Sequence, residues 1–125
     1  NETKTAYDRE QVFSIDLAKE FTGNNEELAI ELFYMFRAEL AGYSEAISAA
    51  TRDNELDKLA EVVHKLHGAS RCCGTLELKH RCEHIEKMIG HETDFDLKKE
   101  TDLLLSAIRS VANYKLKQQC KTPSN

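Results

Sequence analysis

Near the middle of the 125-residue chain stands the stretch His64-Lys65-Leu66-His67-Gly68-Ala69-Ser70-Arg71-Cys72-Cys73-Gly74. Together with the residues just before it, the stretch carries apolar or small side chains at steps of three and four, namely Leu56, Leu59, Val63, Leu66, Ser70 and Cys73. This spacing is typical of the buried face of an amphipathic helix. The stretch therefore predicts the second half of a helix that packs against other helices.

His64 comes one position after this buried face, so we expect its imidazole at the edge of the core, facing outward. Ala60 lies one turn before it and Gly68 one turn after it on the same helix face. A glycine inside a helix costs about 1 kcal/mol relative to alanine. Two explanations of Gly68 remain open: it leaves room for a molecule to approach His64, or it allows close packing against another helix.

The composition fits one helical domain. Hydrophobic residues make up 41% of the chain and charged residues 31%, with one proline and five glycines, which disfavours a β-rich chain with many turns. The sequence contains no apolar run of about 18 residues, as a membrane span needs, and no recognisable signal peptide. Because the first residue is Asn1 and not methionine, we expect the chain to be a piece of a longer protein.

The formal net charge of −5 argues weakly against nucleic acid as a partner. Four of the five histidines and several basic residues nevertheless lie between His64 and His84. A local basic patch fits an acidic partner, although an ordinary solvated surface explains it equally well.

The four cysteines include an adjacent pair and form no CxxC motif; they are Cys72, Cys73, Cys82 and Cys120. This pattern is a poor basis for disulfides, so we expect reduced thiols in a cytosolic compartment. Cys73 and Cys82 fall on apolar helix faces and are expected to be small core residues.

The rest of the chain predicts helices separated by short loops. A short helix over 15–21 is expected after Ser14 as its N-cap, and a long helix from 26 to about 51 after Asn24 or Asn25. Asp53 or Asn54 is expected to cap the central helix. A fourth helix should begin after Thr75 and end at Gly90, and a last one should run from about 97 to 118.

Each of these helices has a predicted apolar face. The long helix is expected to bury Leu28, Leu32, Met35, Phe36, Leu40, Tyr43, Ile47 and Ala50, and Gly42 within it is expected to mark a close helix contact. The last two helices are expected to bury Leu78, Cys82, Ile85 and Ile89, and Leu97, Thr101, Leu104, Ile108 and Val111. Four such helices with short loops predict an all-α fold: an antiparallel up-down four-helix bundle with a short additional N-terminal helix.

The predicted domain organisation is an N-terminal arm over residues 1–13, the bundle over 14–118 and a disordered tail over 119–125. In the predicted hairpin about Thr75, His64 is 11 residues before the turn and Glu86 is 11 residues after it, so the two lie at the same height. A carboxylate that accepts a hydrogen bond from Nδ1–H would leave Nε2 free as a nucleophile. Because the spacing does not determine the rotation of the helix, a solvated Glu86 remains an equally good explanation.

Cationic residues border His64. His67 and Arg71 follow it at three and seven positions and Lys65 at one, and such donors could steady an anionic group carried by the imidazole. An exposed imidazole with small neighbours and nearby cations suits a phosphoryl acceptor.

The same stretch resembles the histidine phosphotransfer (HPt) domains of bacterial phosphorelays. Their signature is a histidine, usually a lysine at +3, and glycines at +4 and +10, which correspond to His64, His67, Gly68 and Gly74. The resemblance covers about residues 13 to 115 and includes the stretches Ser14-Ile15-Asp16-Leu17-Ala18 and Gly23-Asn24-Asn25-Glu26-Glu27-Leu28.

His67 stands where lysine is usual. The run His-Lys-Leu-His-Gly is similar to the HPt modules of BarA/GacS-type hybrid sensor histidine kinases, so the substitution fits a subfamily trait. Imidazole titrates near neutral pH and lysine does not, so His67 raises the question of pH dependence.

The resemblance implies a two-component phosphorelay role: His64 accepts a phosphoryl group from a receiver-domain aspartate and passes it to a response-regulator aspartate. It implies no ATP-dependent kinase activity, and the sequence contains no glycine-rich nucleotide loop. It further implies no cofactor on this chain, Mg²⁺ on the receiver, and receiver domains of the parent kinase and of a response regulator as partners. We expect a monomer without nucleic-acid or membrane contact, located in the cytoplasm and tethered to the inner membrane through a parent sensor kinase.

Expected docking residues border the same surface and the first helix; they are Ala60, Lys65, Gly68, Ser70, Arg71, Ile15 and Leu17. Ile15 and Leu17 have the alternative explanation of plain core residues. Two rival functions stay open. One is a metal-binding bundle, because His80 and His84 lie four positions apart and His64 and His67 three, although a closed zinc site needs four converging ligands. The other is a purely structural helical adaptor, or an HPt-like module that docks receivers without accepting phosphate.

Overall fold

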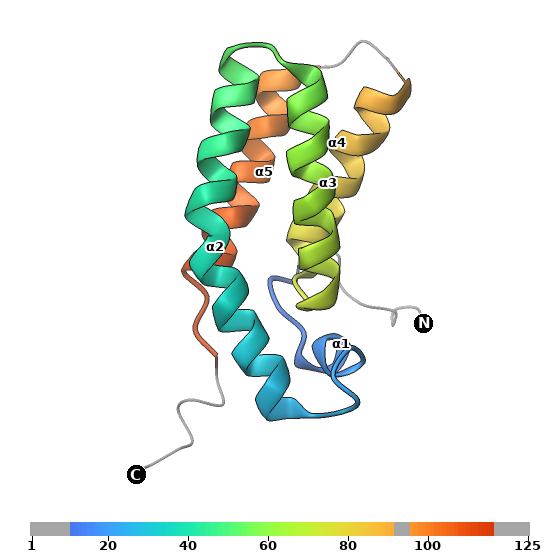
Figure 1. Cartoon of the computed structure of the whole chain (residues 1–125), viewed down its shortest axis with the longest axis vertical. Helices are drawn as coiled ribbons and strands as arrows, with labels where there is room; N and C mark the ends of the chain where they lie inside the picture. Colours follow the sequence, from blue (N-terminus) through green and yellow to red (C-terminus); the bar gives the residue numbers. More distant parts are fainter. Residues whose placement is uncertain (1–10, 92–95, 117–125) are drawn as a thin grey trace.

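The computed structural model describes residues 11–91 and 96–116. In these ranges the chain forms five helices and no strand: α1 (Ile15–Lys19), α2 (Glu26–Arg52), α3 (Leu56–Cys72), α4 (Leu76–His91) and α5 (Leu97–Ala112). The four long helices run side by side and α1 lies across one end of the bundle (Figure 1). None of the described helices combines the length and the apolar character needed to cross a membrane.

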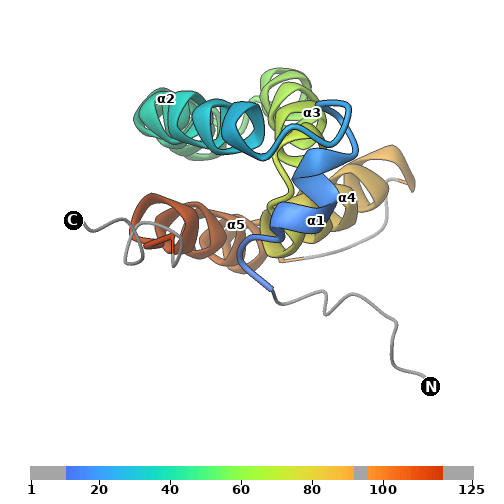
Figure 2. The ribbon, with the colours of Figure 1, turned by 90° about the horizontal axis from the view of Figure 1, so that it is seen from below.

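The four long helices are arranged as the sides of a closed ring. Each contacts its neighbour in sequence, and α5 returns to contact α2. Seen along the bundle, α2 and α3 form one layer and α4 and α5 the other, with α1 beneath the end of α3 (Figure 2). The predicted antiparallel four-helix bundle with a short N-terminal helix is therefore confirmed.

Two predicted N-caps are confirmed. Ser14 accepts a hydrogen bond from the backbone N–H of Leu17 at the start of α1, and Asn25 accepts one from Leu28 at the start of α2. The predicted cap of α3 at Asp53 or Asn54 is wrong. Asn54 adopts a left-handed conformation (φ 54°) that ends α2, so α3 begins one residue later, after Glu55.

Several helix ends differ from expectation. α1 ends at Lys19 rather than near residue 21, α4 continues through Gly90 to His91, and α5 ends at Ala112. Of the expected arm over 1–13, residues 1–10 lie outside the described residues. Phe13 is buried, with its ring centroid 4.5 Å from that of Phe33. The tail over 119–125 and Cys120 also lie outside the described residues.

The core contains the predicted faces of α3, α4 and α5, except at Leu56. There the prediction is wrong, because this first residue of α3 is 40% exposed. The fully buried large side chains of the core include Leu59, Val63, Leu66, Leu78, Ile85, Leu104 and Val111. In α2 the prediction is wrong at Leu28 and Met35, which are 39% and 60% exposed. Ala29 and Phe33 are buried in their place, because the aromatic ring of Phe33 is turned into the core against Phe13.

Gly74 joins α1 to the turn between α3 and α4. Its φ of +72° favours glycine, and a Cβ there would lie 2.5 Å from the carbonyl oxygen of Ser14. The Ser14 N–H donates to the Gly74 carbonyl at 2.8 Å. Gly42, by contrast, has no atom within 4 Å of an added Cβ, so the expected close helix contact at Gly42 is wrong.

Cys73 and Cys82 are small core residues, as predicted. Both are buried and are free thiols, as is the partly exposed Cys72. Burial raises the pKa of Cys73 to about 11 and raises the pKa of Cys82 further still, so both thiols stay neutral at physiological pH.

Candidate functional site

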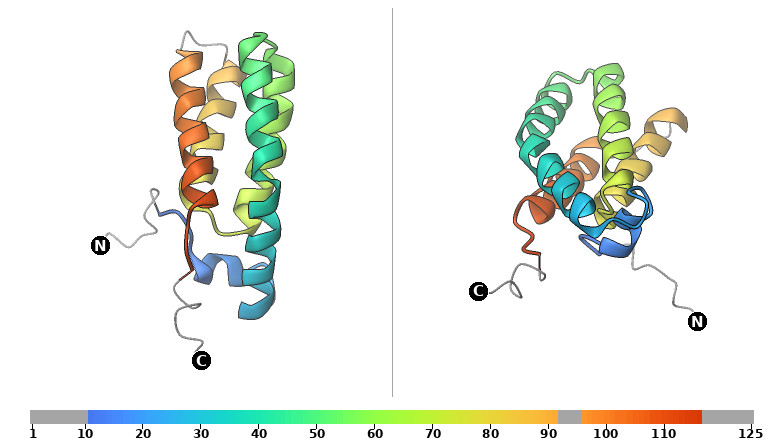
Figure 3. Two further views of the ribbon diagram at one scale, coloured as in Figure 1. Left: turned by 90° about the vertical axis from the view of Figure 1, so that its left-hand side faces the viewer. Right: turned by 60° about the horizontal axis from the view of Figure 1, so that its bottom comes forward.

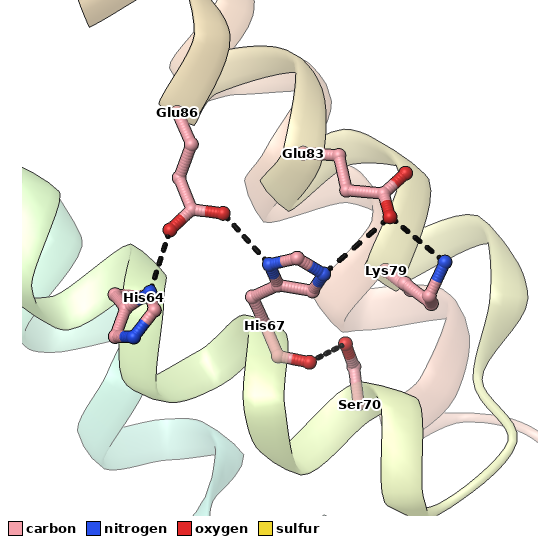
Figure 4. Close-up of polar contacts among 6 residues, drawn as sticks. All are labelled: His64, His67, Ser70, Lys79, Glu83 and Glu86. Atoms are coloured by element: carbon pink, nitrogen blue, oxygen red, sulfur yellow. Dashed lines mark hydrogen bonds and ion pairs between the residues drawn. The ribbon is translucent and has the colours of Figure 1, made fainter. Parts of the chain in front are cut away.

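His64 lies on the outer face of α3 with its side chain 80% exposed. Its Nδ1 is 2.9 Å from Oε2 of Glu86, and the other ring nitrogen points away from that carboxylate (Figure 4). Because a carboxylate accepts, Nδ1 carries the proton in the neutral ring. Nε2 is then left with a lone pair directed at solvent.

Glu86 comes from α4 and bridges two histidines of α3. Its second oxygen, Oε1, is 2.7 Å from Nδ1 of His67, and its side chain is 26% exposed. The views in Figure 3 show α3 and α4 running alongside each other, which brings residues equidistant from their turn together. The contact between His64 and Glu86 that the spacing about Thr75 suggested is therefore present, and a freely solvated Glu86 is not.

His67 turns toward α4 and is only 24% exposed. Its Nε2 is 3.5 Å from Oε2 of Glu83, and the same oxygen accepts a hydrogen bond from Lys79 Nζ at 2.8 Å (Figure 4). Sequence reasoning placed His67 among groups steadying an anion and missed Glu83 and Lys79. Their spacing of four on one helix was the available signal.

Glu83 is held in its ionised form. Partial burial acts to raise its pKa, but the hydrogen bond from Lys79 and the charges of Lys79, His67 and His80 outweigh burial, so the pKa of this carboxyl is lowered overall. A permanently charged carboxylate therefore faces Nε2 of His67 at neutral pH.

Gly68 forms an open surface beside His64. It is exposed, and a Cβ built there meets no atom within 4 Å. Close packing against another helix is therefore the wrong explanation of this glycine. Two further residues border His64. Lys65, the next residue along α3, is exposed, and Ala60, one turn earlier, is partly exposed.

Ser70 is not a surface residue. It is fully buried and its hydroxyl donates to the backbone carbonyl of His67 at 2.9 Å, so the expected direct contact with a partner is wrong. Its place in the buried stripe of α3 explains this. Arg71, two turns from His64 and therefore about 10 Å along the helix, lies with its guanidinium carbon 5.8 Å from the ring centroid of Phe21.

A groove of about 300 Å³ lies between the end of α1 and the turn from α3 to α4. Its lining includes Leu17, Phe21, Arg71 and Lys79, and Phe21 is 46% exposed. Leu17 therefore borders an open surface. Ile15 instead packs against the core, as its alternative explanation proposed.

The metal-binding alternative finds no support in the part of the chain that the structure describes. There, no group of three or more histidine, cysteine, aspartate or glutamate side chains is placed to hold a metal ion. His84, one of the suggested ligands, lies with Nε2 3.4 Å from Oε1 of Glu100 on α5.

Comparison with known proteins adds independent information. The model of the Hpt domain family matches residues 31–114. The sensor histidine kinase GacS of Pseudomonas protegens is 35% identical over 82 residues, and the sensor protein GacS of Pseudomonas syringae pv. syringae is 31% identical over 83 residues. Each match covers 66% of this chain and 9% of the relative, so the chain spans about a tenth of the length of these proteins.

A solved structure is similar over most of the chain. The HPT domain of a sensor hybrid histidine kinase from Shewanella is 28% identical and matches with a TM-score of 0.71. The match covers 84% of this chain and 90% of that one.

Proposed function

This chain belongs to the Hpt domain family and has a histidine phosphotransfer role in a phosphorelay; we propose that His64 is the residue that carries the phosphoryl group. The observation that supports this assignment is the orientation of one imidazole. His64 is 80% exposed, Glu86 occupies its Nδ1 at 2.9 Å, and Nε2 is left facing solvent. A nucleophile needs an accessible lone pair, and this arrangement keeps one there.

The proposed reaction is a reversible exchange between aspartate and histidine. The lone pair of Nε2 attacks the phosphorus of a receiver's aspartyl phosphate, the Nε2–P bond forms, and the O–P bond breaks to release the aspartate carboxylate. Onward transfer to a second receiver reverses these bond changes. The transition state is loose and in line, so this chain contributes position and charge, and the Mg²⁺ belongs to the receiver.

Glu86 has the role of a positioning residue in this scheme. It fixes the tautomer of His64 and stabilises the imidazole as Nε2 gives up its lone pair to phosphorus. Gly68 leaves space beside the ring for the approaching receiver, and the exposed Lys65 adds a positive charge.

The proposed partners are receiver domains, one on a hybrid sensor kinase and one on a response regulator. They would dock across Ala60, Gly68 and Arg71 toward the groove lined by Leu17. We place the domain in the cytoplasm as a monomer, tethered to the inner membrane through a parent kinase of the GacS type. It has no ATP-dependent kinase activity of its own.

A transfer experiment tests this function. The receiver domain of a GacS-type sensor kinase is labelled with radioactive acetyl phosphate in the presence of Mg²⁺, freed of the small molecule and mixed with this protein. The expected product is an acid-labile, base-stable label in the peptide that contains His64. A protein that binds the receiver and acquires no label is an adaptor, which would refute the proposal.

A further inference from the structure

We propose that Glu83 is a positioning residue that keeps His67 as an imidazolium ion, and that this charge holds Glu86 in place against His64. The inference rests on the proposed role of His64 and deepens it. It assigns transfer a dependence on pH that arises from His67 rather than from the phosphoryl acceptor.

The geometry around His67 favours the doubly protonated ring. Nδ1 is 2.7 Å from Oε1 of Glu86, and Nε2 is 3.5 Å from Oε2 of Glu83. A neutral imidazole has one N–H and one lone pair, so it would direct a lone pair at one of the two carboxylates. Only the imidazolium ion presents an N–H to both.

Lys79 fixes the orientation of Glu83. Its Nζ is 2.8 Å from the same oxygen that faces His67, and the side chains of Lys79 and Glu83 are 29% and 42% exposed. This contact also keeps the Glu83 carboxyl ionised, as the lowered pKa indicates. The Glu83 carboxylate is therefore already fixed in position, with a charged oxygen facing Nε2 of His67, before transfer begins.

The charge of His67 acts on His64 through Glu86. A charged donor makes a shorter and stronger hydrogen bond than a neutral one, so the imidazolium ion orients the shared carboxylate with Oε1 toward itself and Oε2 toward His64. Loss of the proton weakens this hold and leaves the carboxylate charge less compensated. The transfer rate is then expected to fall as pH rises.

Charged groups face His67 from α4 and from its own helix. From α4 these are Glu83 and Glu86, with Lys79 and His80 behind Glu83, and from α3 itself His64. In the described residues the ionic contacts of His67 come from α4. The two nearest groups are both carboxylates, and they favour the protonated ring.

The first experiment measures the ring directly. Nitrogen-15 NMR follows protonation of both ring nitrogens of His67 in the full chain across neutral pH, without any phosphoryl donor. In Glu83→Gln the fraction of His67 rings that carry a proton on both nitrogens at neutral pH is expected to fall, because the opposite charge is removed. The matched control is Asp102→Asn on α5, which breaks a similar lysine–carboxylate pair (3.2 Å) away from His64 and leaves that fraction unchanged. An unchanged fraction in Glu83→Gln overturns the inference.

The second experiment measures transfer from one labelled receiver at a series of pH values. The transfer rate of each variant is divided by that of the unaltered chain at the same pH, so that the pH dependence of the receiver cancels. His67→Lys is expected to abolish the fall in rate at alkaline pH, because lysine stays charged there, and Glu83→Gln is expected to move the fall to lower pH. A fall that persists in His67→Lys contradicts the inference. Failure of the unaltered chain to acquire label refutes the proposed function, and with it the effect of His67 on transfer.

Discussion

Among the histidine–glutamate pairs that join neighbouring helices of this bundle, those of His64 and His84 differ in which ring nitrogen is left free. Between α3 and α4, His64 meets Glu86 through Nδ1 at 2.9 Å with its side chain 80% exposed. Between α4 and α5, His84 meets Glu100 through Nε2 at 3.4 Å and is 38% exposed. Nδ1 is bonded to Cγ, the ring carbon that carries Cβ, whereas Nε2 is at the far end of the ring. The nitrogen of His84 that has no carboxylate partner in this pair is therefore the one closer to the backbone and less accessible.

The neighbours of the two rings differ as well. One turn on either side of His64 stand Ala60 and Gly68, whereas His84 stands between His80 and Met88. A carboxylate partner is therefore common to the proposed phosphoryl acceptor and to His84. What distinguishes His64 is an outward Nε2 with small residues around it.

The largest effect is expected from removing each histidine in turn. His64→Gln should reduce labelling by a phosphorylated receiver to background, because no other residue replaces Nε2. His84→Gln should retain labelling within about twofold, and the melting temperature of His64→Gln should stay within a few degrees because the ring is exposed. A large loss of thermal stability in His64→Gln would show that its ring supports the core.

The next effect concerns the space beside the ring. Gly68→Gln should slow transfer by about 100-fold by crowding His64, although it stabilises the helix by up to about 1 kcal/mol. Gly90→Gln is the matched control, since Gly90 is also an exposed glycine with no atom within 4 Å of an added Cβ. If both variants transfer at the normal rate, the space at Gly68 does not serve the approach of a receiver.

The two carboxylates provide a smaller contrast. Glu86→Gln should slow transfer by about tenfold, equivalent to about 1.4 kcal/mol, because an amide oxygen is a weaker acceptor and carries no charge. Glu100→Gln should leave the transfer rate unchanged, since its histidine takes no part. Equal rates in the two variants would mean that the carboxylate beside His64 has no role in transfer.

The smallest effect is on stability in acid. The pKa of Glu83 is lowered in the folded protein, so its contribution is present above the ordinary carboxyl range and is lost as pH falls through the folded value. Because the pair with Lys79 is partly exposed, we expect about 0.5 kcal/mol or less. Thermal melts from about pH 5 to about pH 3 should show a steeper loss of stability in the unaltered chain than in Glu83→Gln.

Much of the fold follows from helical spacing alone. The faces of α4 and α5, and that of α3 beyond Leu56, were predictable because only one apolar stripe fits each of them. In α2 two overlapping stripes compete, and the burial of Phe33 rather than Met35 depends on Phe13, which lies far away in sequence. Asn54 was misassigned for a related reason: the same residue types begin helices and end them.

The sequence predicted how far along the helices the site residues lie, but not how each helix is rotated about its own axis. Equal distance from Thr75 placed Glu86 beside His64 along the helices. Which carboxylates His67 meets depends on how α4 is rotated about its axis, and residue spacing does not determine that rotation. Glu83 therefore escaped notice, although its position four residues after Lys79 indicated an ion pair.

The outward Nε2 of His64 has a consequence for the rate at which phosphoryl groups pass through the proposed relay. One atom on one flank receives the phosphoryl group and gives it up, so donor and recipient must occupy the same place at different times. Excess unphosphorylated donor then competes with the recipient, and the flow of signal is greatest at an intermediate ratio of the two proteins.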